Sequence, residues 1–255
     1  MNQKKTEIIT ISNIKGGVGK SVLTIIFSYI LKDIGKKVLI VDLDPQNSLT
    51  SYFIKSIKNL EINNIYEFLK ENIDLNFDKY LNRINDNICL IPSHPNLHLF
   101  NQQVDSYKVL SLKHRLKRFL PNYDFDYILI DTPPNLDSLL DNALHITDKL
   151  VVPIQVERFS VESLSILMKY ISKISMYIDK DIDISIVENQ FIKNRNTFKD
   201  IENVIQEKYG YLIKGKIHFT NKIKVFTNNL QEPSHKEIYY QECMDCLSNI
   251  LKIKI

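Results

Sequence analysis

The strongest constraint on this chain is a glycine-rich stretch at residues 15–21 with the sequence KGGVGKS. A β-branched run precedes it at residues 8–11, and apolar residues with helical spacing follow it at residues 22–31. In a turn between a strand and a helix, glycines allow backbone N–H groups to converge on phosphate oxygens at the helix N-terminus. The sequence therefore predicts a nucleotide phosphate-binding loop rather than an ordinary glycine turn.

Each part of this loop has an expected task. Lys20 would reach the β- and γ-phosphates, and the Ser21 hydroxyl would hold Mg²⁺. The backbone around these two side chains would cradle the phosphates. The predicted nucleotide contacts in the loop are Gly16, Gly17, Val18, Gly19, Lys20, Ser21 and Val22.

Carboxylates follow two further apolar runs. Asp42 and Asp44 come after a run at residues 37–41, and Asp131 ends a similar run at residues 126–130. Open α/β sheets bind ligands at the carboxyl ends of their parallel strands, so we expect these carboxylates to face the loop. Asp131 would then bind Mg²⁺ directly or through a water molecule, with Asp42 beside it.

The remaining pattern predicts an α/β fold. Apolar runs at residues 150–155 and 182–187 alternate with helical patterns, which is typical of a mostly parallel twisted sheet with helices on both faces. Ser160 is the expected N-cap of the helix between these two runs. With 255 residues, 44% hydrophobic content and no evident linker or repeat, we predict a single P-loop NTPase domain over residues 1–255.

Composition restricts the compartment. The three cysteines are odd in number and lack the spacing of a disulfide framework, which favours a reducing cytoplasm. No apolar run approaches the roughly eighteen residues of a membrane span. The net charge of +3 is compatible with nucleic acid but too small to argue for it.

The loop departs from the common pattern G-x-x-x-x-G-K-[ST]. Ile14 occupies the position of the first glycine, and a second lysine, Lys15, precedes Gly16. This form resembles the deviant Walker A motif of the ParA/MinD superfamily, and the stretches DLDPQ at residues 42–46 and IDTPP at residues 130–134 are similar to ParA/Soj-type partition ATPases. The resemblance implies a nucleotide-dependent homodimer in which Lys15 contacts the nucleotide of the other subunit.

The resemblance also implies an activity. ATP and Mg²⁺ would be the cofactors of an ATPase with Lys15, Lys20 and Asp44 as its catalytic residues, Asp44 positioning the attacking water. Asn189, which follows the run at residues 182–187, would contact the adenine. Such a dimer binds DNA non-specifically in the cytoplasm, on the nucleoid, and hydrolyses ATP slowly until a ParB-like centromere-binding partner protein stimulates it. Val22 stands where the family usually has threonine, so a hydroxyl near the α-phosphate is lost.

Positive charge gathers late in the chain. Residues 193–224 contain eight basic and three acidic residues, the local signature of phosphate-backbone binding. The candidate DNA contacts are Lys193, Arg195, Lys222 and Lys224. The alternative is a solvated surface in a lysine-rich protein.

Three alternative functions belong to other classes of protein. A MinD-like positioning ATPase would bind membrane through an amphipathic C-terminal helix, and residues 247–255 are apolar with two lysines. A nitrogenase-like iron protein would need paired cysteines for a cluster, which Cys89, Cys243 and Cys246 do not provide. A nucleotide-switch scaffold would bind ATP with little hydrolysis. Because DLDPQ favours partition proteins, no membrane partner is expected.

Overall fold

The computed structural model describes residues 5–70, 76–103, 107–192 and 199–255. The strands are β1 Glu7–Ile11, β2 Val38–Asp42, β3 Asn82–Arg83, β4 Ile88–Ile91, β5 Tyr127–Asp131, β6 Lys149–Ile154, β7 Asp183–Phe191 and β8 Ile213–His218. The α-helices are α1 Lys20–Asp33, α2 Ser48–Tyr52, α3 Ile65–Lys70, α4 Ser111–Phe119, α5 Ser138–Leu144, α6 Ser160–Ile178, α7 Lys199–Tyr209, α8 Asn221–Asn228 and α9 Ile238–Leu251.

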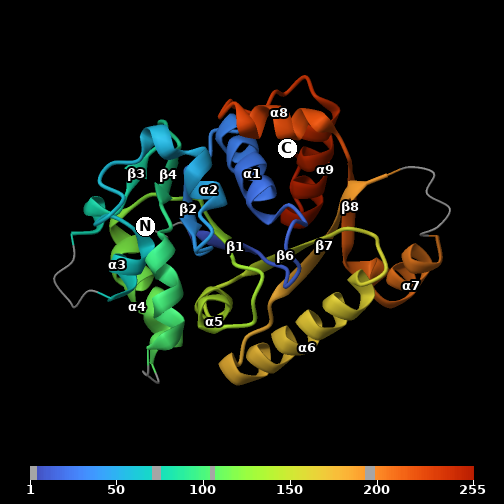
Figure 1. Cartoon of the computed structure of the whole chain (residues 1–255), viewed down its shortest axis with the longest axis horizontal. Coiled ribbons are helices and arrows are strands. Elements are labelled where there is room, and N and C mark those ends of the chain that lie inside the picture. The colour runs from blue at the N-terminus through green and yellow to red at the C-terminus, as the bar shows by residue number, and fades with distance from the viewer. Residues whose placement is uncertain (1–4, 71–75, 104–106, 193–198) are drawn as a thin grey trace.

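The strands form a single eight-stranded sheet in the order β3-β4-β2-β5-β1-β6-β7-β8. Every neighbouring pair is parallel except β3 and β4 at one edge. Strand β1 lies between β5 and β6, so the loop that follows it emerges near the middle of the sheet. The predicted α/β fold with a mostly parallel sheet is confirmed (Figure 1).

Helices cover both faces of the sheet, as the alternation of side chains along each strand requires. In β2, Val38 and Ile40 join the core under α1 and α9, whereas Leu39 and Val41 join the core under α3, α4 and α5. A third cluster lies under α5, α6 and α7. Figure 1 shows α1, α8 and α9 on one side of the sheet and α4, α5 and α6 on the other.

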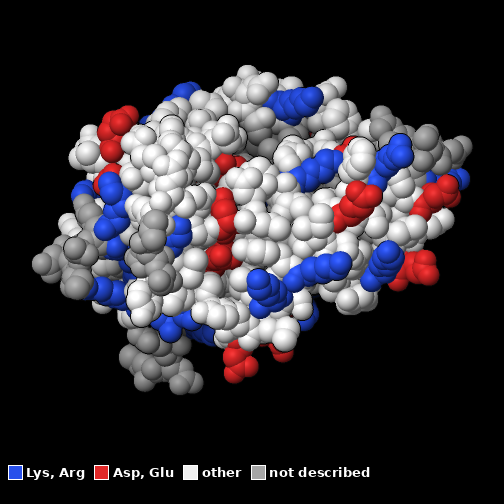
Figure 2. All heavy atoms as spheres, turned by 60° about the horizontal axis from the view of Figure 1, so that its bottom comes forward, with Lys and Arg blue, Asp and Glu red and all other residues white. Residues whose placement is uncertain are grey.

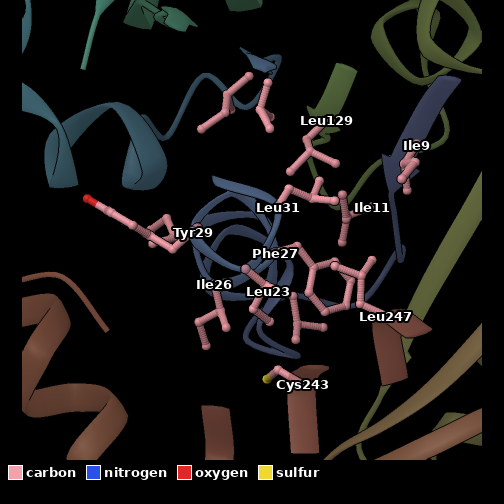
Figure 3. Packing of buried hydrophobic residues seen from close by; sticks show 14 of the residues in the cluster. Ile9, Ile11, Leu23, Ile26, Phe27, Tyr29, Leu31, Leu129, Cys243 and Leu247 are labelled. Carbon is pink, nitrogen blue, oxygen red and sulfur yellow. The ribbon is translucent and has the colours of Figure 1, made fainter. Parts of the chain in front are cut away.

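Helix α1 is buried on most of its surface, which fixes the loop that precedes it. Phe27 and Leu31 are fully buried, and Leu23 packs in the same cluster as Leu247 of α9 (Figure 3). The helix ends at Asp33, and a left-handed glycine follows it: Gly35 has φ 73°, and its N–H donates to the carbonyl of Lys32. Since α9 covers α1, the C-terminal part of the chain holds the phosphate loop's helix in place.

One predicted boundary is wrong. Helix α6 begins at Ser160 itself, and Phe159 occupies the N-cap position without a side-chain cap. The Ser160 hydroxyl instead donates to the carbonyl of Gln155, and the N–H of Glu157 donates to that hydroxyl at 3.3 Å. The serine therefore closes the turn between β6 and α6 instead of capping the helix. Over the described ranges, no helix has the length and apolar character needed to cross a membrane.

Candidate nucleotide-binding site

The loop between β1 and α1 has the backbone that its glycines predict. Gly17 and Gly19 have φ values of 76° and 93°, in the left-handed region that favours glycine. A Cβ atom on Gly19 would lie 2.2 Å from the amide nitrogen of Asn189, so no larger residue fits there without displacing that side chain. Helix α1 starts at Lys20 without a side-chain cap. Its first N–H groups are thus left for an anionic ligand.

Side chains from the neighbouring strand ends hold the first half of the loop. Asn13 donates to the carbonyl of Pro153 at 2.7 Å and accepts the N–H of Lys15 at 2.9 Å. Two glutamines, Gln155 after β6 and Gln190 in β7, donate to the carbonyl of Gly17 at 3.1 and 2.9 Å. Neither glutamine was predicted from the sequence. Their only signal was the position of each near the carboxyl end of a strand.

Asn189 holds the second half of the loop. Its Nδ2 atom donates to the carbonyl of Val18 at 2.8 Å, and its Oδ1 atom accepts the N–H of Gln190 at 2.9 Å. Val18 is fully buried and, unlike Gly17 and Gly19 on either side of it, does not line the cleft beside the loop, so its contact with a nucleotide stays a prediction. Asn189 also lines the cleft beside the loop. Its contact with adenine stays a prediction, and its visible role is to support the loop.

Lys20 lines the cleft beside the loop, and its contact with the phosphates stays a prediction. Its side chain is buried, and its Nζ donates to the carbonyl of Lys15 at 3.3 Å, across the mouth of the loop. Burial lowers the pKa of Lys20, while the carboxylates of Asp131 and Asp44 act in the opposite direction. A phosphate group bound in the loop would give this buried ammonium group an anionic partner.

Asp42 organises the segment that carries Asp44. One Asp42 oxygen accepts the N–H of Asp44 at 3.0 Å, and the other accepts the N–H and hydroxyl of Thr50 at 3.0 and 2.6 Å. Asp44 accepts the N–H of Gln46 at 2.9 Å and lines the cleft opposite Lys20. Burial raises the pKa of Asp42 to about 7 and also raises the pKa of Asp44. Because both Asp42 oxygens are engaged within the protein, Asp42 supports this loop and is poorly placed to bind a metal directly.

Asp131 has the features of a cation ligand. It ends β5 in register with Asp42, is fully buried, and neither of its carboxylate oxygens has a hydrogen-bond partner among the described residues. Burial and the neighbouring Asp42 raise its pKa well above the usual range, while the nearby Ser21 hydroxyl and Lys20 counteract this shift. Buried carboxylate oxygens without partners carry a large free-energy cost unless a cation or water reaches them. Asp131 and Ser21 therefore fit a divalent cation.

A cleft of about 480 Å³ runs from the loop to the segment after β8. Its polar end contains the loop, Asp44 and Lys20. Its other end is lined by Phe219, Ile223 and Thr227, a mixture of aromatic, apolar and hydroxyl groups suited to a base. Phe219 was not predicted. Val22 also lines the cleft, and its contact with the nucleotide stays a prediction.

Lys15, the unusual lysine of the loop, does not line the cleft that Lys20 lines. Its ammonium group forms an ion pair with Glu157, in the turn between β6 and α6. The Lys15 side chain is 27% exposed and that of Glu157 is 39% exposed. Lys15 thus lies on the outer rim of the site, where another molecule can reach it.

In the basic segment predicted to bind DNA, residues 193–224, some of the described lysines are engaged in ion pairs. Lys222 forms an ion pair with Glu237 at 2.6 Å, whereas Lys224 lines the cleft with its Nζ 5.9 Å from the centre of the Phe219 ring. Lys216 lies between Glu188 and Glu202. Lys193 and Arg195 fall outside the described residues. On the face that Figure 2 turns toward the viewer, away from α8, lysines and arginines lie in separate groups with acidic side chains among them.

The two cysteines of the C-x-x-C pair are part of the core. Cys243 is fully buried and Cys246 nearly so, and burial raises the pKa of both thiols. A Cβ atom on Gly215 of β8 would lie 2.4 Å from the sulfur of Cys246 in α9, so α9 packs closely on β8. Within the described ranges, histidine, cysteine and carboxylate side chains form no group that could hold a metal on their own.

A glycine loop between strand and helix, a buried lysine and carboxylates at adjacent strand ends define a P-loop nucleoside triphosphatase. A family model described as an AAA domain matches residues 6–184. The chain belongs to this family, as a ParA/Soj-type ATPase.

Individual relatives agree with this assignment. The sporulation initiation inhibitor protein Soj of Bacillus subtilis is 34% identical over 179 residues, 69% of each chain. The chromosome partitioning protein ParA of Myxococcus xanthus is 31% identical over 214 residues, 81% of this chain and 72% of that protein. A plasmid partition protein of Borrelia burgdorferi B31 bound to AMPPNP is 35% identical, with a TM-score of 0.87 over 97% of this chain and 99% of that one.

Proposed function

We propose that this protein is a DNA partition ATPase that alternates between a monomer and an ATP-bound sandwich dimer. The dimer binds DNA without sequence preference, and ATP hydrolysis, slow until a ParB-like partner stimulates it, returns the protein to the monomer. The observation that carries the proposal is the position of Lys15, on the outer rim of a complete phosphate loop. Lys20 already serves the nucleotide of its own subunit, so a second lysine on the rim is useful to a nucleotide across an interface.

ATP and Mg²⁺ are the ligands in this proposal, supported by the AMPPNP bound to the similar Borrelia protein. Ser21 and Asp131 would hold Mg²⁺, with Asp42 behind them, and Lys20 would bind the β- and γ-phosphates. When bound, Mg²⁺ neutralises charge on the phosphate oxygens. Asp44, held by Asp42 through its N–H, would orient the attacking water from the side facing Lys20.

Residues 1–255 act as one ATPase domain in this proposal, in the cytoplasm and on the nucleoid. Non-specific DNA binding would rest on basic side chains such as Lys224, which is not ion-paired among the described residues and lines the cleft mouth. The ion pair of Lys222 with Glu237 makes Lys222 the weaker candidate. Two such faces in a dimer would contact the phosphate backbone together.

The membrane-positioning alternative is less well supported. In α9, Leu247, Ile250 and Leu251 pack in the core with α1, so the apolar stripe of this helix is not available to lipid. An interfacial helix needs such a stripe on its free face. A sedimentation assay with anionic vesicles would decide between the two, since a partition ATPase stays in the supernatant with ATP.

Replacement of Lys15 tests the proposal. A Lys15→Gln variant should bind ATP with near wild-type affinity, because Lys20 and the loop remain, yet stay monomeric and hydrolyse little ATP. Light scattering with ATP and Mg²⁺ measures the mass, and a fluorescent ATP analogue measures binding. A Lys15→Gln protein that forms dimers as readily as the wild type would contradict the sandwich dimer.

A further inference from the structure

Within its own chain, Lys15 is paired with a carboxylate that would compete with the nucleotide of a second subunit. Its ammonium group pairs with Glu157, a residue 142 positions away that the turn after β6 brings to the loop. Both side chains are partly exposed, so the pair lies at the surface where a second subunit would meet the first. In the monomer, Lys15 is therefore already paired with the Glu157 carboxylate, and this ion pair must break before Lys15 can bind a nucleotide of a second subunit.

The backbone on both sides of this contact is fixed. The N–H of Lys15 donates to Asn13, and its carbonyl accepts a hydrogen bond from Lys20. On the other side, the N–H of Glu157 is held by the Ser160 hydroxyl. The remaining freedom belongs to the two side chains. Lys15 can consequently exchange partners by rotation of its side chain, without rearrangement of the loop.

We propose that Glu157 is a latch that holds Lys15 within the monomer and sets the ATP concentration at which the dimer forms. This inference rests on the proposed sandwich dimer. A triphosphate in the opposite subunit carries more charge than one carboxylate and can draw Lys15 away, because charge-assisted contacts to phosphate are strong. A diphosphate lacks the γ-phosphate, so Lys15 stays with Glu157. The latch thereby sharpens the distinction between ATP and ADP.

Removal of the latch should favour the dimer. A partly exposed ion pair changes an equilibrium by up to about fivefold, and two pairs break in each dimer, so Glu157→Gln should lower the dimer dissociation constant by up to about 25-fold with ATP. ATP binding by the monomer should not change, since Glu157 does not line the cleft. The matched control is Glu162→Gln, which removes the same charge from the exposed first turn of α6.

The double variant Lys15→Gln/Glu157→Gln tests whether Glu157 acts through Lys15. If it does, the double variant behaves as Lys15→Gln alone and stays monomeric. Sedimentation of all five proteins with ATP, ADP and Mg²⁺ gives the dissociation constants, and a wild-type protein that never dimerises would refute the proposed function before any variant is compared. With a wild-type dimer in hand, an unchanged or weakened Glu157→Gln dimer, or a double variant that regains dimerisation, overturns the latch.

Discussion

Asp44 lies where, in the proposed mechanism, its charge would serve chemistry more than folding. It is 8% exposed, and the one backbone N–H that it accepts only partly offsets its burial, so its pKa is raised. Asp42 accepts the N–H of Asp44 and so holds its backbone, while the N–H of Gln46 holds one oxygen of the Asp44 carboxylate. A carboxylate aimed into a cleft beside a buried lysine is well suited to orient a water molecule.

We expect Asp44→Ala to separate binding from hydrolysis. The variant keeps Lys20, Ser21 and the loop, so it should bind ATP and accumulate as a dimer. Loss of a positioned base or water-orienting group typically costs a hundredfold or more, so phosphate release should fall by about that factor. Asp124→Ala, at an exposed carboxylate, is the control. Wild-type phosphate release by Asp44→Ala would show that another group positions the water.

The raised pKa of Asp42 predicts a pH dependence of folding. Its pKa is about 7 in the folded protein against an ordinary value of 3.8, so the folded state keeps a proton that the unfolded state releases. This contribution to stability is complete below the ordinary pKa and is lost as pH rises through 7. The nucleotide-free protein should therefore lose free energy of unfolding between about pH 4 and pH 7.

Urea denaturation at several pH values measures this trend. Asp42→Asn mimics the protonated carboxyl, so the variant should show a flatter dependence than the wild type. Asp131 contributes in the same direction, so some slope remains. Equal slopes in the two proteins would mean that Asp42 keeps its charge in the folded state.

At this scale, local sequence predicts well and distant contacts do not. The loop, Lys20 and Asp131 could be placed because each lies next to the strand that positions it. The pairing of Lys15 with Glu157 joins residues 142 positions apart and depends on which strands become neighbours. The two engaged oxygens of Asp42 were equally unpredictable, because they depend on the path of the chain to Thr50.

At the scale of elements, the packing of α9 on α1 supports the site from behind. Both helices belong to the cluster on one face of the sheet, and α9 also packs on β8 through Cys246 and Gly215. Helix α1 begins at Lys20, so displacement of its far side would shift the groups that bind phosphate. The stability of this layer and the affinity for nucleotide should therefore be linked.

Leu247→Ala tests the contribution of this layer. Leu247 is fully buried in the cluster with α1, so its truncation should cost about 2–5 kcal/mol of unfolding free energy. Ile238→Ala, at the exposed first residue of the same helix, should cost less than about 1 kcal/mol. Urea titrations of both variants give the comparison. A loss below about 1 kcal/mol for Leu247→Ala as well would mean that the α1–α9 contact contributes little.

Elements with a continuous apolar run were predicted more reliably than short or polar ones. The runs that became β2, β5 and β6 were recognised because strands buried on both faces of a parallel sheet are apolar throughout. Strand β3 has two residues and no such signal. The start of α6 was misplaced because a serine before a helix can cap it or close the preceding turn, and only the fold decides.

At the scale of the whole molecule, the residues proposed to bind nucleotide and Mg²⁺ lie together at the carboxyl ends of the parallel strands β1, β2, β5, β6 and β7. The rim of that edge carries Lys15 and Glu157, and Lys224 lies at the mouth of the cleft. A monomer with a net charge of +3 offers few contacts to DNA. A dimer doubles them, and affinity for a polyanion rises steeply with the number of phosphates contacted.

Retention on non-specific DNA is the most direct test of the central claim, that ATP converts this protein into a DNA-binding dimer. Two unrelated duplexes would be tethered to a surface, and the bound protein measured with ATP–Mg²⁺ and with ADP–Mg²⁺ at matched salt. The account predicts strong retention on both duplexes with ATP, little with ADP, and none for Lys15→Gln in either nucleotide. Equal retention with ATP and ADP, or wild-type retention by Lys15→Gln, would contradict it.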